Sequence, residues 1–228
     1  MDSRWDIRGI IFDMDGVLCA SEPFMEEAAC RMFKEQHGAD VVPTDFHPFS
    51  GTGEDQYLGG VAKKYGVTLR MPADKDRAYE IYLDMIKGRL PPLPGAVDFI
   101  AGLRRRGMPL AVASSADRVK VNGNLKQIGI PPETFKAVVT GTEIARKKPF
   151  PDLFLAAAVH LGLPPAQCMV VEDTASGIRA AKAAGCACLG LTTSFPEARL
   201  REHGPDWIAA DLAHAAEVLR GEPWFNHA

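Results

Sequence analysis

The chain carries the stretch IRGIIFDMDGV at residues 7–17, and this stretch decides the fold. Residues 7–12 form a short apolar run rich in β-branched side chains, which is typical of a strand buried on both faces. Asp13 and Asp15 follow directly. Two carboxylates this close repel each other unless a cation holds them, although Asp and Gly are also common in solvated turns. The stretch therefore predicts a buried strand with an acidic pair, either functional or solvated, at its carboxyl end.

Five further apolar runs follow the first one, at residues 110–113, 137–140, 169–171, 187–191 and 207–209. Amphipathic segments with helical periodicity lie between them, at residues 97–106, 116–127, 151–161 and 175–184. An alternation of buried strands with crossover helices is typical of a parallel sheet covered on both faces. We therefore expect an α/β protein whose core is a doubly wound, Rossmann-like parallel sheet.

The segment between the first and second predicted strands is too long for one crossover. It contains helical patterns at residues 24–36, 54–65 and 74–87, and it ends in the proline-rich stretch LPPLPG at residues 90–95. Successive prolines stop a helix and stiffen a linker. We predict a small α-helical cap domain at 19–93, inserted into a catalytic core of 1–18 and 94–228. Such an insertion lies above the carboxyl edge of the sheet, where open α/β folds bind ligands.

A second acidic pair follows the fourth predicted strand, where Glu172 and Asp173 precede a helix. Because the carboxyl ends of parallel strands meet at one edge, these acids are expected near Asp13. Oxygen ligands without histidine suit Mg²⁺. We predict Asp13, Asp15, Glu172 and Asp173 as the magnesium site, with Asp13 as a nucleophile. As an alternative, Asp173 or Thr174 caps the next helix.

Phosphate-binding groups are expected at the same edge. Ser114 and Ser115 follow the second predicted strand, where hydroxyls and free N–H groups at a helix start suit an anion. Lys147 and Lys148 follow the third predicted strand, and a lysine there would neutralise both the phosphate and the nucleophile. The residue before a proline is held extended, which favours Lys148. The alternatives are a simple helix cap for Ser114 and a solvated basic loop for the lysines.

Charge and composition exclude several classes of protein. The formal net charge is −3 and the sequence pI about 6.1, so the chain has no overall positive charge that would attract nucleic acid or anionic lipid. The five cysteines form no CxxC pair, and the histidines show no zinc-ligand spacing. The first residues resemble neither a signal peptide nor a membrane span. We expect a soluble, cytoplasmic protein, or a chloroplast stromal one if from a plant or alga, that is a monomer or weak dimer.

Taken together, the residues at the four strand ends resemble the motif pattern of the haloacid dehalogenase superfamily. That pattern is an aspartate pair, then Ser or Thr, then Lys, then an acidic pair. The resemblance covers essentially the whole chain, and the insertion resembles the helical cap of the β-phosphoglucomutase and phosphoglycolate phosphatase branch. It implies that Asp13 attacks phosphorus, that Asp15 acts as acid and base, and that Mg²⁺ is held by Asp13, the Asp15 carbonyl and Asp173, with Glu172 in or next to the shell. Ser114 and Lys148 would bind the phosphoryl group.

The loop at residues 49–55 is expected to select the substrate through Gly51, Thr52, Gly53 and Glu54. β-Phosphoglucomutases carry a cap histidine and an arginine that binds a second phosphate, but Met25 and Glu54 occupy the corresponding positions here. Glu54 would repel a second phosphate. A closer resemblance, at residues 51–54, 58–62 and 112–121, is to the phosphatase-like domain of suppressor-of-quenching proteins, where thioredoxin-like and β-propeller domains accompany it. This resemblance does not identify a substrate.

The sequence thus predicts a Mg²⁺-dependent phosphatase that acts on a small phosphorylated metabolite through an aspartyl-phosphate. Its partners are expected to be that metabolite, without nucleic acid or membrane. One alternative is a sugar-phosphate mutase of the β-phosphoglucomutase kind. Another, from a different class, is a regulatory or interaction domain that keeps the fold but has little turnover.

Overall fold

A computed structural model describes residues 4–226 and contains a six-stranded parallel sheet. The strands are β1 (Gly9–Phe12), β2 (Leu110–Ser114), β3 (Ala137–Thr140), β4 (Cys168–Glu172), β5 (Ala187–Leu191) and β6 (Trp207–Ala209). Their order in the sheet is β3-β2-β1-β4-β5-β6. The first strand is therefore central and the order reverses beside it, as expected for a doubly wound α/β fold. The predicted fold class is confirmed.

The register brings the ends of the central strands together. Phe12 of β1 lies opposite Val112 of β2 and Val171 of β4. All residues of these three strands are buried, which explains why they are continuous apolar runs without alternation. The polar residues that follow Phe12 and Val171 must therefore emerge side by side at the carboxyl edge.

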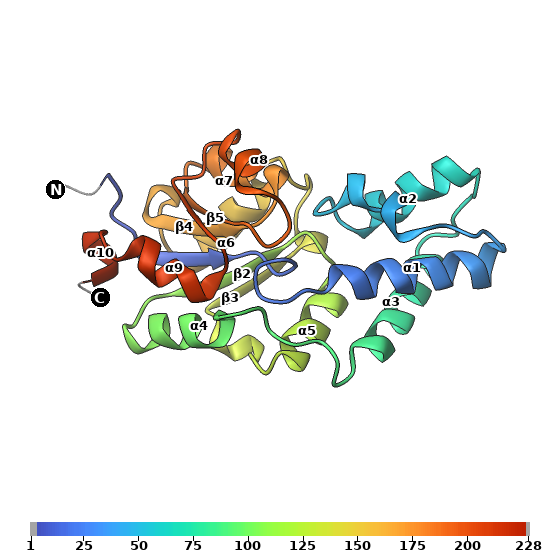
Figure 1. The fold of residues 1–228 in the computed structure, drawn as a ribbon, viewed down its shortest axis with the longest axis horizontal. Coiled ribbons are helices and arrows are strands. Elements are labelled where there is room, and N and C mark those ends of the chain that lie inside the picture. Colours follow the sequence, from blue (N-terminus) through green and yellow to red (C-terminus); the bar gives the residue numbers. More distant parts are fainter. Residues whose placement is uncertain (1–3, 227–228) are drawn as a thin grey trace.

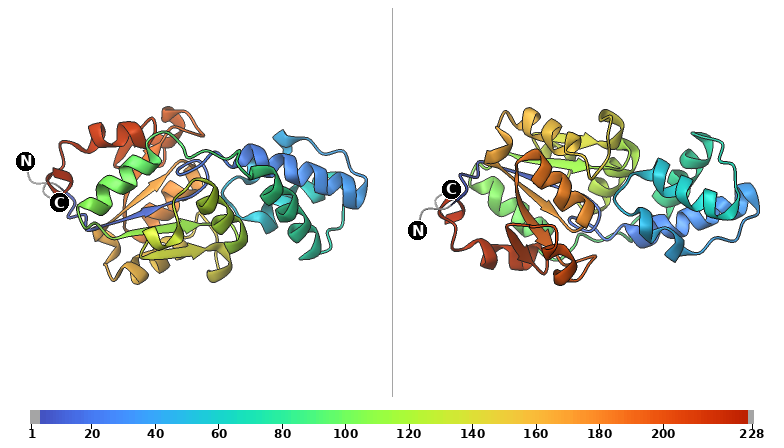
Figure 2. Two further views of the ribbon diagram at one scale, coloured as in Figure 1. Left: turned by 90° about the horizontal axis from the view of Figure 1, so that it is seen from below. Right: turned by 90° about the horizontal axis from the view of Figure 1, so that it is seen from above.

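Two layers of helices cover the sheet (Figure 1, Figure 2). One layer contains α4 (Ala96–Arg105), α5 (Arg118–Gln127) and α9 (Leu212–Leu219), and the other contains α6 (Asp152–Leu161) and α7 (Ala175–Ala184). Successive residues of β1 face opposite layers: Phe12 packs with the first and Ile11 with the second. The crossover helices thus bury both faces, and only the edges and strand ends remain for binding.

The long segment between β1 and β2 is helical. It forms α1 (Glu22–His37), α2 (Glu54–Tyr65) and α3 (Ala73–Ile86), with 3₁₀ helices η1 (Pro43–Asp45) and η2 (His47–Phe49). Figure 1 shows these helices beyond the carboxyl ends of the strands. The two connections to the core lie side by side, because the Leu93 N–H donates to the Leu18 carbonyl at 2.9 Å and Cys19 forms an isolated bridge with Pro92.

The remaining elements are short: η3 (Pro132–Thr134), η4 (Gly141–Glu143), η5 (Pro165–Gln167), α8 (Glu197–Arg201) and α10 (Pro223–Asn226). Three predicted starts are wrong by two residues, since β1 begins at Gly9 and not at residue 7, α1 at Glu22 and not at residue 24, and α5 at Arg118 and not at residue 116. Asp117 precedes α5 with extended backbone angles, which leaves residues 115–117 in the loop after β2. Between residues 4 and 226, no helix has the length and apolar character that crossing a membrane requires.

A buried carboxylate ties the helices of the insertion together. Asp74, at the start of α3, is 1% exposed and accepts hydrogen bonds from the Arg70 N–H at 2.7 Å and from His37 of α1 at 2.7 Å. Burial alone would raise the pKa of Asp74, but these hydrogen bonds outweigh it and lower the pKa below 3.8. The ionised form is therefore favoured by folding.

We predict that Asp74→Asn lowers the free energy of unfolding by about 1–3 kcal/mol at pH 7, the cost of leaving buried donors without their charged acceptor. A carboxylate with a lowered pKa stabilises above its unfolded pKa and loses that contribution as pH falls through the folded one. Urea unfolding at pH 7 and pH 3 checks this. The difference in the free energy of unfolding between wild type and variant should be smaller at pH 3 than at pH 7. An equal difference at both pH values would contradict the stabilising role of the ionised Asp74.

Candidate active site

Asp13, the first residue after β1, is paired with a buried lysine. The Lys148 Nζ lies 2.8 Å from the Asp13 Oδ1 and also contacts the Glu172 Oε1. The Lys147 ammonium instead donates to the main-chain carbonyls of Ser115 and Gly141. Of the two lysines considered from the sequence, Lys148 is therefore the one that reaches Asp13.

Glu172 holds this lysine in place. Its Oε1 contacts Lys148, and its Oε2 accepts hydrogen bonds from the Asp173 N–H, the Thr174 N–H and the Thr174 hydroxyl at 2.9–3.0 Å. Gly177 of α7 leaves the necessary room, because a Cβ there would lie 1.9 Å from the Glu172 carboxyl carbon. With both oxygens engaged, Glu172 is better placed next to a metal shell than in it.

Asp173 has an oxygen available for a cation. Its Oδ2 accepts a hydrogen bond from Ser194, whereas its Oδ1 is buried without a hydrogen-bond partner in the described part of the chain. Carboxylate oxygens of Asp13, Glu172 and Asp173 lie within 4.8 Å of one another. Because the ligand atoms are all oxygens, with an unsatisfied one among them, the set fits a hard divalent cation such as Mg²⁺.

The electrostatics of the cluster support a cation there. Burial raises the pKa of Asp13 to about 7, with Lys148 opposing the shift and Glu172 adding to it. Burial, and the neighbouring Glu172 and Asp13, also raise the pKa of Asp173 well above 3.8. Three buried carboxyls face one ammonium, so a bound divalent cation would favour the ionised form of all three.

We predict that Lys148→Met lowers the free energy of unfolding by about 3–5 kcal/mol, because it leaves two buried carboxylates without their cation. Lys147→Met is the matched control, since the Lys147 ammonium contacts only main-chain carbonyls. Urea unfolding of both variants, without added metal, measures the difference. If the free energy of unfolding fell equally in the two variants, the contacts of Lys148 with Asp13 and Glu172 would not stabilise the fold.

Ser114 and Ser115 lie at the carboxyl end of β2, and both are buried. The Ser114 hydroxyl accepts a hydrogen bond from the Ala116 N–H at 3.1 Å. The Ser115 hydroxyl has no hydrogen-bond partner within residues 4–226. Ser114 thus orders the turn after β2 but does not cap α5, whose N-cap residue is Asp117, and the Ser115 hydroxyl remains available to a ligand.

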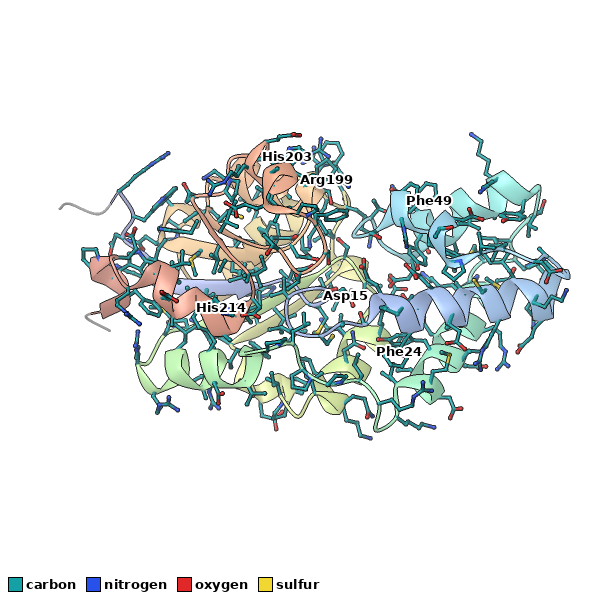
Figure 3. The ribbon with its side chains drawn as sticks, viewed as in Figure 1. Asp15, Phe24, Phe49, Arg199, His203 and His214 are labelled. Carbon is teal, nitrogen blue, oxygen red and sulfur yellow. The ribbon has the colours of Figure 1, made fainter. Side chains whose placement is uncertain are left out.

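Asp15 points away from the acidic cluster, toward the inserted helices. The Lys120 Nζ of α5 lies 3.1 Å from its Oδ2, and Ser21 and Asn124 donate to its Oδ1, the latter at 3.4 Å. Figure 3 shows Asp15 where the strand ends meet α1. The Asp15 carboxylate is not part of the cluster that could hold a metal ion, so only its main-chain carbonyl is left for the predicted ligand role.

The loop at residues 49–55 approaches the core at two points. A Cβ on Gly51 would lie 3.5 Å from the Ser176 hydroxyl, and one on Gly53 would lie 3.0 Å from the Ser115 carbonyl. Gly53 has φ +86°, a conformation that favours glycine. The Thr52 hydroxyl turns back to the Phe49 carbonyl at 2.6 Å, so Thr52 shapes the loop. Glu54 begins α2 and lies 3.3 Å from the Lys120 Nζ.

The sequence analysis missed several residues that contact the site, among them Ser21 and Asn124, which donate to Asp15, and also Lys120 and Ser194. Lys120 is 5% exposed and joins Asp15 to Glu54, and Ser194 donates to Asp173. Ser194 had a usable signal, because it follows the fifth strand at the same edge of the sheet. Lys120 had none, since a lysine inside an amphipathic helix is usually a solvated one.

Comparisons with known proteins identify the family that the chain is similar to. The family model described as haloacid dehalogenase-like hydrolase matches residues 7–185. Phosphoglycolate phosphatase of Neisseria meningitidis is 30% identical over 94% of this chain and 94% of its own length. The crystal structure of CbbY from Rhodobacter sphaeroides in complex with phosphate superposes with a TM-score of 0.83 and 26% identity, over 96% of this chain and 99% of that one.

A plant protein shows higher identity over a smaller share of its length. Protein SUPPRESSOR OF QUENCHING 1, chloroplastic, of Arabidopsis thaliana is 42% identical over 96% of this chain. The match spans only 21% of the plant protein. The resemblance seen in the sequence is confirmed, while the activity of the whole plant protein does not carry over.

Proposed function

The chain belongs to the haloacid dehalogenase-like hydrolase family, and from this premise we propose that it is a Mg²⁺-dependent phosphatase for a small phosphorylated metabolite. The reaction would proceed through an aspartyl-phosphate on Asp13. The observation that carries the proposal is the pairing of Asp13 with Lys148 beside the unsatisfied Asp173 oxygen, with Asp15 on the side of the inserted helices.

In the first half-reaction, an Asp13 carboxylate oxygen attacks the phosphorus. The new bond joins that oxygen to phosphorus, and the bond between phosphorus and the alcohol oxygen breaks. The Asp15 carboxyl gives its proton to the departing oxygen, which leaves as a neutral alcohol. Lys148 lies 2.8 Å from Asp13 and stabilises the charge of the phosphoryl group during transfer.

In the second half-reaction, water attacks the phosphorus of the aspartyl-phosphate. The Asp15 carboxylate takes the proton of the water, and the bond between phosphorus and the Asp13 oxygen breaks. Inorganic phosphate leaves, and both aspartates return to their starting forms. Ser21, Asn124 and Lys120 hold the Asp15 carboxylate in one orientation through both steps.

Mg²⁺ would be held by Asp13, Asp173 and the Asp15 carbonyl, with Glu172 beside it, and when bound it would supply charge stabilisation for the transferring phosphoryl group. The Glu172 contacts to Lys148 and to the Asp173 N–H fix the relative positions of the cationic and metal-binding groups. Ser115 is proposed to bind a phosphoryl oxygen or the leaving group through its free hydroxyl.

The helical insertion is proposed to act as a cap, with a core of 1–18 and 94–228 and a cap of 19–93. Supporting this division, the two connections pair at Cys19 and Pro92 and at Leu18 and Leu93, so they could act as one hinge. Cap closure over the site would exclude bulk water.

A reducing compartment is proposed, namely the cytoplasm or, in a plant or alga, the chloroplast stroma. All five cysteines are free thiols, including the buried Cys186, just before β5, and the buried Cys188, within β5.

Phosphate release from a panel of sugar phosphates, nucleotides and phosphorylated acids tests the proposal. The expected result is Mg²⁺-dependent release from at least one small phosphomonoester. A folded protein that releases phosphate from none of them would favour the regulatory-domain alternative. Isomer formation without phosphate release would favour a mutase, although three carboxyls near the leaving-group side, those of Asp15, Glu22 and Glu54, disfavour a second phosphate.

Asp15→Asn separates the two half-reactions. We expect kcat on alkyl phosphates to fall about 10²–10⁴-fold, the usual value of a general acid and base. p-Nitrophenolate leaves without needing a proton, so p-nitrophenyl phosphate should still give a rapid burst of one nitrophenol per chain before slow turnover. Stopped-flow absorbance measures the burst. If the variant lost kcat equally on alkyl phosphates and on p-nitrophenyl phosphate and gave no burst, the role of Asp15 as the acid would be contradicted.

A further inference from the structure

A small cavity of about 40 Å³ lies beside Asp15, between the inserted helices and the core. Glu22, Glu54 and Tyr57 line it from the insertion, and Ser115 and Lys120 join Asp15 from the core. Because Asp15 is the proposed acid, this cavity lies where the alcohol part of a substrate would leave.

Three buried polar atoms of this cavity lack hydrogen-bond partners among residues 4–226: the Glu54 Oε2, the Tyr57 hydroxyl and the Ser115 hydroxyl. The Tyr79 hydroxyl also faces Glu54 and opposes the rise that burial causes in the pKa of Glu54, but no hydrogen bond of normal geometry joins them. Buried polar atoms are normally paired, so three unpaired ones around one cavity indicate a polar ligand. Together they offer a carboxyl acceptor and two hydroxyls that can donate or accept.

The only cation that lines the cavity in the described structure is already engaged. The Lys120 Nζ lies 3.1 Å from Asp15 and 3.3 Å from Glu54, and its side chain is 6% exposed. A carboxylate or a second phosphate in the cavity would therefore meet carboxyls without a free cation. Such like-charge contacts disfavour the binding of an anionic group in this cavity.

The same surroundings favour hydrogen bonding over ion pairing. Burial raises the pKa of Glu54, against the opposing effect of Lys120. Burial and the neighbouring Asp15 likewise raise the pKa of Glu22. The Lys120 ammonium already pairs with Asp15 and Glu54, so a cationic amine in the cavity would meet a like charge, and neutral hydroxyls suit the cavity better.

We propose that this cavity binds the alcohol part of the substrate and that this part is a small uncharged polyol, with Glu54, Tyr57 and Ser115 as its hydrogen-bonding partners. The proposal rests on the phosphatase activity proposed above. A cavity of this size holds a few water molecules, at roughly 10–15 Å³ each. Glycerol 3-phosphate is the smallest substrate of this class with more than one free hydroxyl.

The test compares two esters that differ at one carbon. Glycerol 3-phosphate ends in a hydroxymethyl group where 3-phosphoglycerate carries a carboxylate. We expect kcat/KM to be at least about tenfold higher for the glycerol ester, the equivalent of about 1.4 kcal/mol. Phosphoethanolamine adds a cationic arm and should also be the poorer substrate. A preference for the carboxylate or the amine ester would overturn the proposal.

Variants identify the residues responsible. Glu54→Gln should narrow the ratio between glycerol 3-phosphate and 3-phosphoglycerate at least about fivefold, because one repelling carboxyl is gone. Tyr57→Phe should raise KM for glycerol 3-phosphate about three- to tenfold with little change in kcat, the value of one hydrogen bond. Glu26→Gln, also on the insertion but outside this cavity, is the matched control and should leave the ratio unchanged. An unchanged ratio in Glu54→Gln would overturn the assignment of Glu54.

p-Nitrophenyl phosphate distinguishes the two possible failures. If the folded chain hydrolyses neither it nor any ester, the proposed phosphatase function fails. If the chain hydrolyses it but shows no preference for glycerol 3-phosphate over 3-phosphoglycerate, only the inference about the cavity fails.

Discussion

Asp13→Asn is expected to lower kcat for phosphate release on the order of 10⁴-fold or more, the scale on which enzymes lose turnover when a nucleophile is removed. The amide has the shape of the carboxylate but cannot attack phosphorus. Asp13 is 5% exposed and is joined to Glu172 through Lys148, and Glu172 is itself held by the Asp173 and Thr174 N–H groups, so Glu172 cannot take the position of Asp13 without rebuilding the site. Steady-state phosphate release at saturating substrate measures the effect.

The fold should survive this substitution, because it removes a buried charge whose ionisation burial opposes. Circular dichroism and urea unfolding check the fold. Asp98→Asn, on the exposed first turn of α4, is the matched control and should keep full activity. Turnover within tenfold of wild type in folded Asp13→Asn would exclude Asp13 as the nucleophile.

Removal of magnesium is expected to have the second largest effect. Activity should fall by about 10³-fold or more in EDTA, since a bound metal is worth several kcal/mol of transition-state stabilisation and each 1.4 kcal/mol is about a factor of ten. The reason lies in the cluster of Asp13, Glu172 and Asp173, three buried carboxyls of which Lys148 contacts only the first two. Phosphate release before and after dialysis against EDTA measures the loss.

Adding back Mg²⁺ should restore the rate, whereas Ca²⁺, which is larger and takes more ligands, should restore little of it. Thermal unfolding of the metal-free protein verifies that it remains folded. Full activity in a sample that elemental analysis finds free of metal would rule out the metal assignment.

Most of the fold could be predicted from local sequence patterns. The strands and crossover helices are buried apolar runs and amphipathic segments, and α2, α7 and β5 begin and end where the pattern places them. The insertion was predictable because no convincing strand pattern interrupts residues 19–93. The start of α5 was not, since the extended backbone of Asp117 depends on the loop after β2.

The candidate site could be predicted where its residues directly follow strands. Asp13 and Asp173 come together because the parallel register aligns the ends of β1 and β4. Lys148 follows β3 only after η4 and a loop, and it reaches Asp13 from there. The rest of the site depends on how helices pack. Lys120 reaches Asp15 only because α5 lies beneath the insertion, with the Lys120 Nζ 5.7 Å from the ring of Tyr82. Local periodicity cannot encode such a contact.

The cavity beside Asp15 and the loop at residues 49–55 likewise could be predicted only in part. Gly51, Gly53 and Glu54 were identified from their sequence, and these three line the cavity beside Asp15. Glu22 and Tyr57 line it as well, but on helices whose pattern indicates only an amphipathic face. Their role depends on the docking of the insertion against the core, which no single segment determines.

The central claim is that Asp13 carries the phosphoryl group during turnover, and mass spectrometry of acid-quenched protein tests it most directly. The account predicts a phosphoryl group on the peptide that contains Asp13 when wild type turns over substrate with Mg²⁺, and none in Asp13→Asn. Asp15→Asn should accumulate more of it from p-nitrophenyl phosphate, because the second half-reaction is slowed. Rapid phosphate release with no phosphoryl group on that peptide, or with one on another residue, would contradict the account.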